Sequence, residues 1–157
     1  MGYLAAPNVN NTNYPKGGEK MKILGRHLLA ELADCEPELL VDSAKLEKAM
    51  KDAAKKSGAT VVESVFHRYN PQGLSGIVVI AESHLSIHTW PEYNYAAVDC
   101  FTCGSNVDPK KALLYLKEAL GCKTMQVRDM NRGLPSDMDE YIAHKNFDAQ
   151  FPPAMTG

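Results

Sequence analysis

The middle of the chain contains four strand-like segments in succession, with no helical segment between them. Residues 59–69 (ATVVESVFHRY) are rich in β-branched residues and alternate between apolar and polar side chains, and the turn sequence NPQG (70–73) separates them from residues 74–82 (LSGIVVIAE). Two more segments follow at residues 84–90 and 93–104. This pattern predicts four neighbouring strands.

Further elements are predicted on either side of this block. They are a strand at residues 22–33, a helix from Pro37 to Gly58, a helix at residues 108–121 and a strand at residues 122–130. The first helix is indicated by apolar residues at helical spacing. The second has Asp108 as its cap and Pro109 at its first position, both typical of a helix start.

The resulting order, β-α-β-β-β-β-α-β, has too few crossover helices for a parallel sheet. It predicts an α+β fold, a two-layer α/β sandwich with a mostly antiparallel sheet and the helices packed on one face. The 157 residues suffice for one domain. We expect a flexible arm at residues 1–20, a single catalytic domain at residues 21–134 and a tail at residues 135–157.

Composition excludes several classes of protein. A formal net charge of −2, with 23% charged residues, predicts no nucleic-acid or membrane-surface binding. The sequence has no 18-residue apolar stretch and begins with no secretory signal. Four cysteines at irregular spacing do not resemble a disulfide scaffold, so free thiols in a reducing cytoplasm are expected.

Chemistry-bearing residues gather in ESHLSIHTWPE (82–92) and CFTC (100–103). His84 and His88, four apart in a strand, would lie on one face about 13 Å apart, too far to share an ion, so no metal is predicted. Cys100 and Cys103, three apart, would point to opposite faces. Cys100 then belongs to the core, and Cys103, at the end of the strand, is left accessible to a ligand.

The dipeptide Glu82-Ser83 allows two interpretations. A serine hydroxyl can attack the carbonyl of the preceding residue and convert the peptide into an ester, which opens a route to a pyruvoyl group. A serine in a strand is, however, usually just a solvent-facing residue. The two residues alone favour this second interpretation.

Three segments together change this balance: LGRHLLAEL (24–32), SGATVVESVFHRYNPQGLSGIVVIAESHLSIHTWPEY (57–93) and VDCFTCGSNVDPKKA (98–112). They closely resemble the bacterial and archaeal S-adenosylmethionine decarboxylases, from about Lys22 to Gly133. The resemblance implies an inactive proenzyme that cleaves itself between Glu82 and Ser83 into a β chain (1–82) and an α chain (83–157). The cofactor would be a pyruvoyl group derived from Ser83, without pyridoxal phosphate.

The resemblance also implies roles in processing and catalysis. The carbonyl of the pyruvoyl group at Ser83 would form a Schiff base with the substrate amine and accept electrons during decarboxylation. His88 would be the proton acceptor in processing, and Ser75 would be a second processing residue. Cys103 would donate a proton to the carbanion, a role that suits a thiol.

Two positions match residues that bind the nucleoside in this family. Glu92 would hold the ribose hydroxyls, since a carboxylate can accept two hydrogen bonds. Tyr69 stands where the family commonly has a phenylalanine that stacks on adenine, and it keeps the aromatic face. No role is carried over for Trp90, His84 or His27.

Strand parity constrains how these residues meet. Ser83 and His88 are five apart, so in one continuous strand they would face opposite ways. Either the chain bends between them or His88 serves Ser83 of a partner subunit, and the resemblance favours the partner. The prediction is a homodimer of αβ protomers with shared sites, in which Ser83 and Cys103 of one protomer face Tyr69, Ser75, His88 and Glu92 of the other.

Three alternatives stay open at this stage. The same scaffold could carry a pyruvoyl-dependent arginine or ornithine decarboxylase. A relative that never cleaves could act as a binding or regulatory subunit. A zinc-binding module could use Cys100, Cys103, His84 and His88. On the favoured interpretation the substrate is S-adenosylmethionine, and the product is the aminopropyl donor of spermidine synthesis.

Overall fold

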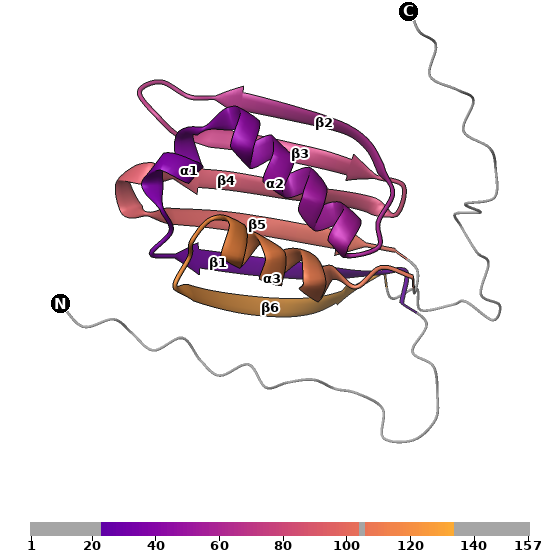
Figure 1. The fold of residues 1–157 in the computed structure, drawn as a ribbon. Helices are drawn as coiled ribbons and strands as arrows, with labels where there is room; N and C mark the ends of the chain where they lie inside the picture. The colour runs from indigo at the N-terminus through magenta and orange to yellow at the C-terminus, as the bar shows by residue number, and fades with distance from the viewer. Residues whose placement is uncertain (1–22, 104–105, 134–157) are drawn as a thin grey trace, which may run out of the picture.

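The computed structural model describes residues 23–103 and 106–133, which form a six-stranded sheet covered by helices (Figure 1). The strand order is β2-β3-β4-β5-β1-β6, and every pairing in it is antiparallel. The elements, in chain order, are β1 (Gly25–Ala33), α1 (Pro37–Val41), α2 (Ser43–Lys56), β2 (Val61–Arg68), β3 (Leu74–Ile80), β4 (Ser83–Trp90), the short 3₁₀ helix η1 (Pro91–Tyr93), β5 (Tyr95–Thr102), α3 (Pro109–Ala119) and β6 (Thr124–Arg132). The predicted α+β class and antiparallel sheet are confirmed.

One predicted helix is in fact two. The segment from Pro37 was expected to continue to Gly58, but α1 ends at Val41 and α2 begins at Ser43. Asp42 between them is extended (φ −87°, ψ 98°), and its side chain accepts a hydrogen bond from the backbone N–H of Lys45. A side chain that caps a helix start competes with continuation of the preceding helix, which the apolar spacing does not reveal.

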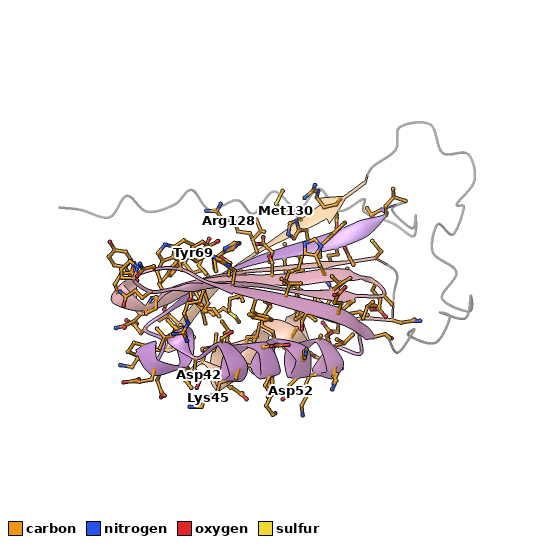
Figure 2. The ribbon with its side chains drawn as sticks, turned by 90° about the horizontal axis from the view of Figure 1, so that it is seen from above. Asp42, Lys45, Asp52, Tyr69, Arg128 and Met130 are labelled. Carbon is orange, nitrogen blue, oxygen red and sulfur yellow. A yellow bond between two sulfur atoms is a disulfide. The ribbon has the colours of Figure 1, made fainter. Side chains whose placement is uncertain are left out.

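The core lies between the sheet and the helices α2 and α3, which cover the same face (Figures 1 and 2). Leu46 and Met50 of α2 and Leu113 and Leu116 of α3 are buried there. They pack with the buried side chains of the sheet in one cluster. The other face of the sheet carries no helix among the described residues, and we call it the open face.

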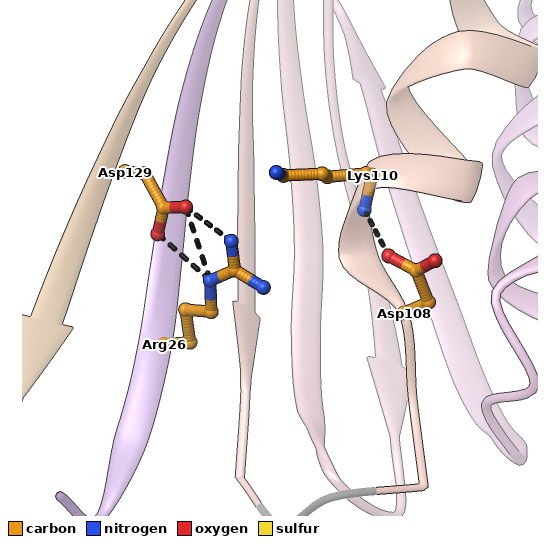
Figure 3. Close-up of polar contacts among 4 residues, drawn as sticks. All are labelled: Arg26, Asp108, Lys110 and Asp129. Carbon is orange, nitrogen blue, oxygen red and sulfur yellow. Dashed lines mark hydrogen bonds and ion pairs between the residues drawn. The ribbon is translucent and has the colours of Figure 1, made fainter. Parts of the chain in front are cut away.

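Two polar contacts lie at the edge of this core (Figure 3). Asp108 caps α3 by accepting a hydrogen bond of 3.1 Å from the backbone N–H of Lys110, as the sequence predicts. Arg26 of β1 forms an ion pair with Asp129 of β6. This pair links β6 to β1, which lies next to it in the sheet.

The expectation of four free thiols is wrong for two of them. Cys35 and Cys122 form a disulfide, whereas Cys100 and Cys103 are free. Cys35 follows β1 and Cys122 precedes β6, and the backbone N–H of Glu36 donates to the carbonyl of Leu120 at 3.0 Å. The antiparallel pairing of β1 with β6 brings these two connections together from 87 residues apart.

Some predictions fall on other parts of the chain. The arm at residues 1–20 and the tail at residues 135–157 lie outside the described residues, so the boundaries of the catalytic domain (21–134) stay predictions. Among the helices in residues 23–103 and 106–133, none has the length and apolar character needed to cross a bilayer.

Candidate active site

The open face carries a row of polar side chains on its central strands. Asp99 of β5 accepts a hydrogen bond of 3.1 Å from the Ser86 hydroxyl and lies 3.4 Å from Nε2 of His27. The other ring nitrogen of His27 lies 3.0 Å from the guanidinium of Arg132. This face also exposes apolar residues, including Val65, Ile77 and Val79 of the strands β2 and β3.

The Glu82–Ser83 peptide lies in the hairpin between β3 and β4. Ile80 pairs with Ser83, so Ala81 and Glu82 form a two-residue turn. The carbonyl of Glu82 accepts a hydrogen bond of 3.0 Å from the backbone N–H of Cys103. This donor touches the oxygen that would become negative if a hydroxyl attacked the Glu82 carbonyl, which is the arrangement of an oxyanion hole.

Ser83 itself is half-buried at the first position of β4. It pairs with Thr102, the last residue of β5, which places the partly exposed Cys103 next to it. Its hydroxyl oxygen lies 3.3 Å from Nδ1 of His84. The structure therefore brings Glu82, Ser83 and Cys103 together, as predicted, and adds the imidazole of His84, to which the sequence assigned no role.

A second group of predicted residues meets at the other end of the β3–β4 ladder. Ser75 pairs with His88, and the Ser75 hydroxyl lies 2.7 Å from Nδ1 of His88. Both line a cavity of about 330 Å³ together with Tyr69, Gln72, Gly73, Leu74, Thr89, Trp90 and Glu92. Tyr69 lies on the open side of the sheet, opposite Asp42 and Asp52 on the helix side (Figure 2). Four predicted residues thus share one cavity.

Five residues of this cavity had no predicted role, among them Gln72 and Trp90. The Gln72 amide donates a hydrogen bond of 3.3 Å to the Glu92 carboxylate. Trp90 lies against Tyr95, with their ring centroids 5.5 Å apart. The position of Trp90 on the same strand face as His88, two residues away, is the signal that could have identified it as a cavity residue.

The two groups do not meet within one chain. Ser83 and His88 belong to the same regular strand, whose pairings with β3 and β5 show no register shift. Five residues of strand separate them by about 16 Å. The alternative in which the chain bends between these residues is therefore wrong. Ser83 with Cys103, and His88 with the cavity, are two separate groups within the chain, and we call each a half-site because the resemblance predicts that they belong to one shared site.

The two free cysteines differ as their spacing predicts. Cys100 is fully buried on the helix side of β5, and burial raises the pKa of its thiol to about 12. Cys103 is partly exposed beyond the end of the strand. The four residues proposed as zinc ligands do not lie on one side of the sheet. Cys100 faces the core, whereas His88 is exposed on the open face, so a zinc module is not supported.

We expect iodoacetamide at pH 8 to label Cys103 and to leave Cys100 unmodified in the folded protein. The thiolate is the reactive species, and a thiol with a pKa near 12 is ionised in only about one molecule in 10⁴ at this pH. Peptide mass spectrometry measures the labelling, and urea-unfolded protein is the control in which both residues react. Comparable labelling of Cys100 in folded protein would contradict its buried placement.

Comparison with known proteins agrees with the geometry. Residues 26–133 match the protein family described as S-adenosylmethionine decarboxylase. An S-adenosylmethionine decarboxylase proenzyme of Thermosipho africanus is 58% identical over 113 residues, which cover 72% of this chain and 87% of the relative. Another, of Thermodesulfovibrio yellowstonii, is 51% identical over 125 residues, covering 80% and 93% of the two chains.

A solved structure shows the same fold. The crystal structure of the adenosylmethionine decarboxylase from Aquifex aeolicus superposes with a TM-score of 0.69 at 31% sequence identity. The match covers 76% of this chain and 99% of that chain. The family match over residues 26–133 includes both groups of predicted site residues described above.

Proposed function

The chain belongs to the S-adenosylmethionine decarboxylase family, and from this membership we propose that it cleaves itself between Glu82 and Ser83 and then decarboxylates S-adenosylmethionine. The observation that carries the proposal is the contact between the Glu82 carbonyl and the backbone N–H of Cys103, directly beside Ser83. The word proenzyme in the names of the relatives agrees with a cleaved precursor.

Self-processing can be written with residues of this chain. Oγ of Ser83 bonds to the carbonyl carbon of Glu82 and the C–N bond breaks, so the peptide becomes an ester and Ser83 gains a free amine. Loss of the Ser83 α-proton to a base then expels the Glu82 carboxylate by β-elimination and leaves a dehydroalanine. Addition of water and release of ammonia convert this residue into a pyruvoyl group. The N–H of Cys103 stabilises the oxyanion of the first step.

The surroundings of Ser83 fit the group that it would form. Ser83 is half-buried at a strand end, with the Cys103 thiol beside it. A pyruvoyl group is formed from the backbone itself, so no lysine is needed to hold it. The pyruvoyl group would supply a carbonyl that accepts electrons during decarboxylation. Cys103, partly exposed next to Ser83, would donate a proton to the substrate carbon, and Ser75 and His88 would assist processing.

The second half-site suits the nucleoside end of the substrate. Its cavity of about 330 Å³ is lined by the aromatic rings of Tyr69 and Trp90 and by the Glu92 carboxylate. Tyr69 is half-exposed, which leaves its ring face accessible for stacking on adenine. Glu92 can accept hydrogen bonds from both ribose hydroxyls. The volume is at the small end for a ligand site, as expected for half of one.

A homodimer would unite the two half-sites. His88 and the cavity lie on the open face, about 16 Å along β4 from Ser83, so a second copy of the chain is the simplest source of the missing half. A two-fold arrangement of open faces would complete two identical sites at once. The exposed Val65, Ile77 and Val79 on this face would then be buried.

Two further parts of the proposal concern context. The product would be decarboxylated S-adenosylmethionine, the aminopropyl donor of spermidine synthesis. The cytoplasmic location expected from the sequence stays a prediction, and its argument from cysteines now applies only to Cys100 and Cys103. Cell fractionation with an antibody against the chain checks it.

Release of labelled carbon dioxide tests the substrate. We expect the processed protein to release labelled carbon dioxide from carboxyl-labelled S-adenosylmethionine and not from carboxyl-labelled arginine or ornithine. Tyr69 and Glu92 can bind adenine and ribose, and arginine and ornithine contain neither group. A folded, cleaved sample that releases the label only from arginine or ornithine would refute the substrate assignment. A folded sample that never cleaves would refute the proposal that this chain is a pyruvoyl-dependent enzyme.

A further inference from the structure

The Glu82 side chain is unusual for a residue in a hairpin turn. Turn residues usually face water, and glutamates are almost never buried without a partner. Glu82 is only 9% exposed. Its carboxylate accepts a hydrogen bond from the backbone N–H of Thr60, with N–O distances of 3.1 and 3.4 Å to its two oxygens. Within the described residues no basic side chain forms an ion pair with it.

The backbone around Glu82 is held from two directions. On one side, the N–H of Ala81 donates to the carbonyl of Thr60 at 2.8 Å, so Thr60 contacts the turn through both its N–H and its C=O. On the other side, the N–H of Cys103 donates to the Glu82 carbonyl at 3.0 Å. Thr60 precedes β2 and Cys103 follows β5, so the hairpin end between them is clamped across the sheet.

We propose that the Glu82 carboxylate is a positioning residue for self-processing: through Thr60 it holds the scissile carbonyl against the Cys103 N–H and within reach of Ser83. This inference rests on the proposed function. Attack on a carbonyl requires a fixed orientation of the reacting atoms, and an oxyanion donor contributes only if the oxygen stays in place. A turn without the anchor could rotate its peptide away from the N–H of Cys103.

Near-isosteric substitutions of Glu82 separate the acceptor from the charge. Glu82→Gln keeps an oxygen that can accept from Thr60, whereas Glu82→Met keeps the length and removes the acceptor. Glu82→Asp keeps the charge but shortens the side chain by one methylene. We expect the Gln variant to cleave within about threefold of the unmodified chain, and the Met and Asp variants to cleave about ten- to a hundredfold more slowly.

The measurement is the first-order rate of cleavage of full-length precursor made by cell-free synthesis, followed by intact mass. Glu118, exposed on α3 on the helix side of the sheet, provides the matched control, since Glu118→Gln and Glu118→Met should both leave the rate unchanged. Thermal melting of each precursor shows whether it is folded. Hydroxylamine, which cleaves esters, should not accelerate the Met or Asp variants, because the anchor acts before the ester forms.

The outcomes separate this inference from the function on which it rests. If the unmodified chain cleaves and the folded Met variant cleaves equally fast, the anchor is refuted. It is also refuted if the Gln variant is as slow as the Met variant, or if hydroxylamine restores fast cleavage. If the Met variant does not fold, the Asp variant decides: cleavage of the Asp variant at the same rate as the Gln variant refutes the role of the Glu82 carboxylate as an anchor. An unmodified chain that never cleaves instead overturns the proposed function.

Discussion

Substitution Ser83→Ala is expected to leave the chain as one uncleaved polypeptide without decarboxylase activity. Alanine has no hydroxyl to attack the Glu82 carbonyl, so neither the ester nor the pyruvoyl group can form, although the hydrogen bond from Cys103 is retained. Without an electron-accepting carbonyl the loss of rate should be on the order of 10⁶ or more, which means no measurable turnover. Intact-mass spectrometry and release of labelled carbon dioxide measure the two effects.

The control for this substitution is a serine outside both half-sites. Ser64 of β2 donates a hydrogen bond of 2.7 Å to Glu47 of α2 on the helix side, and Ser64→Ala should cleave as the unmodified chain does. Borohydride should reduce a carbonyl at the new terminus of the control and find none in Ser83→Ala. Cleavage of the Ser83→Ala chain between residues 82 and 83 would contradict the assignment of Ser83 as the nucleophile.

Mixing two inactive variants should restore activity if the half-sites come from different subunits. In a dimer of Ser83→Ala with His88→Ala, one composite site contains both substitutions and the other contains neither. Random pairing makes half of all dimers mixed, and each mixed dimer has one intact site. Co-expression should therefore yield about a quarter of the wild-type activity, whereas each variant alone should yield almost none. In the mixture only the His88→Ala chain should be cleaved.

A second pair of variants is the control for explanations other than a shared site. Co-expression of Ser83→Ala with Cys103→Ala should not restore an intact site, because both substitutions fall in the same half-site. Purified variants should be mixed under conditions that allow subunit exchange, and differently tagged copies confirm that mixed dimers are present. Confirmed mixed dimers of Ser83→Ala with His88→Ala that stay uncleaved would contradict the shared site.

Local patterns in the sequence predicted most of the fold. The alternation in residues 59–69 and 74–82 corresponds to β2 and β3, and the cap at Asp108 corresponds to the start of α3. Such patterns depend on side-chain directions within a few residues of each other. For the same reason the spacing of Cys100 and Cys103 correctly placed the first in the core and the second at the strand end.

The candidate site was predicted mainly from the family resemblance. Parity along one strand did show, without it, that Ser83 and His88 do not meet in a continuous strand, and the regular pairing of β4 confirms that they lie apart. The extended backbone of Asp42, which divides one predicted helix into two, was missed because capping depends on a single side chain rather than on a repeating pattern.

The sequence by itself determined the strand and helix segments, apart from the break at Asp42, and the family resemblance supplied the candidate residues for the chemistry. Only the tertiary structure decided which distant residues become neighbours: Thr60 with Glu82, Glu82 with Cys103, and Cys35 with Cys122. The physical reason is that periodicity reflects side-chain directions within one element, whereas these contacts depend on the order and register of strands that are far apart in the chain. The anchored position of the Glu82 carbonyl belongs to this second kind of information.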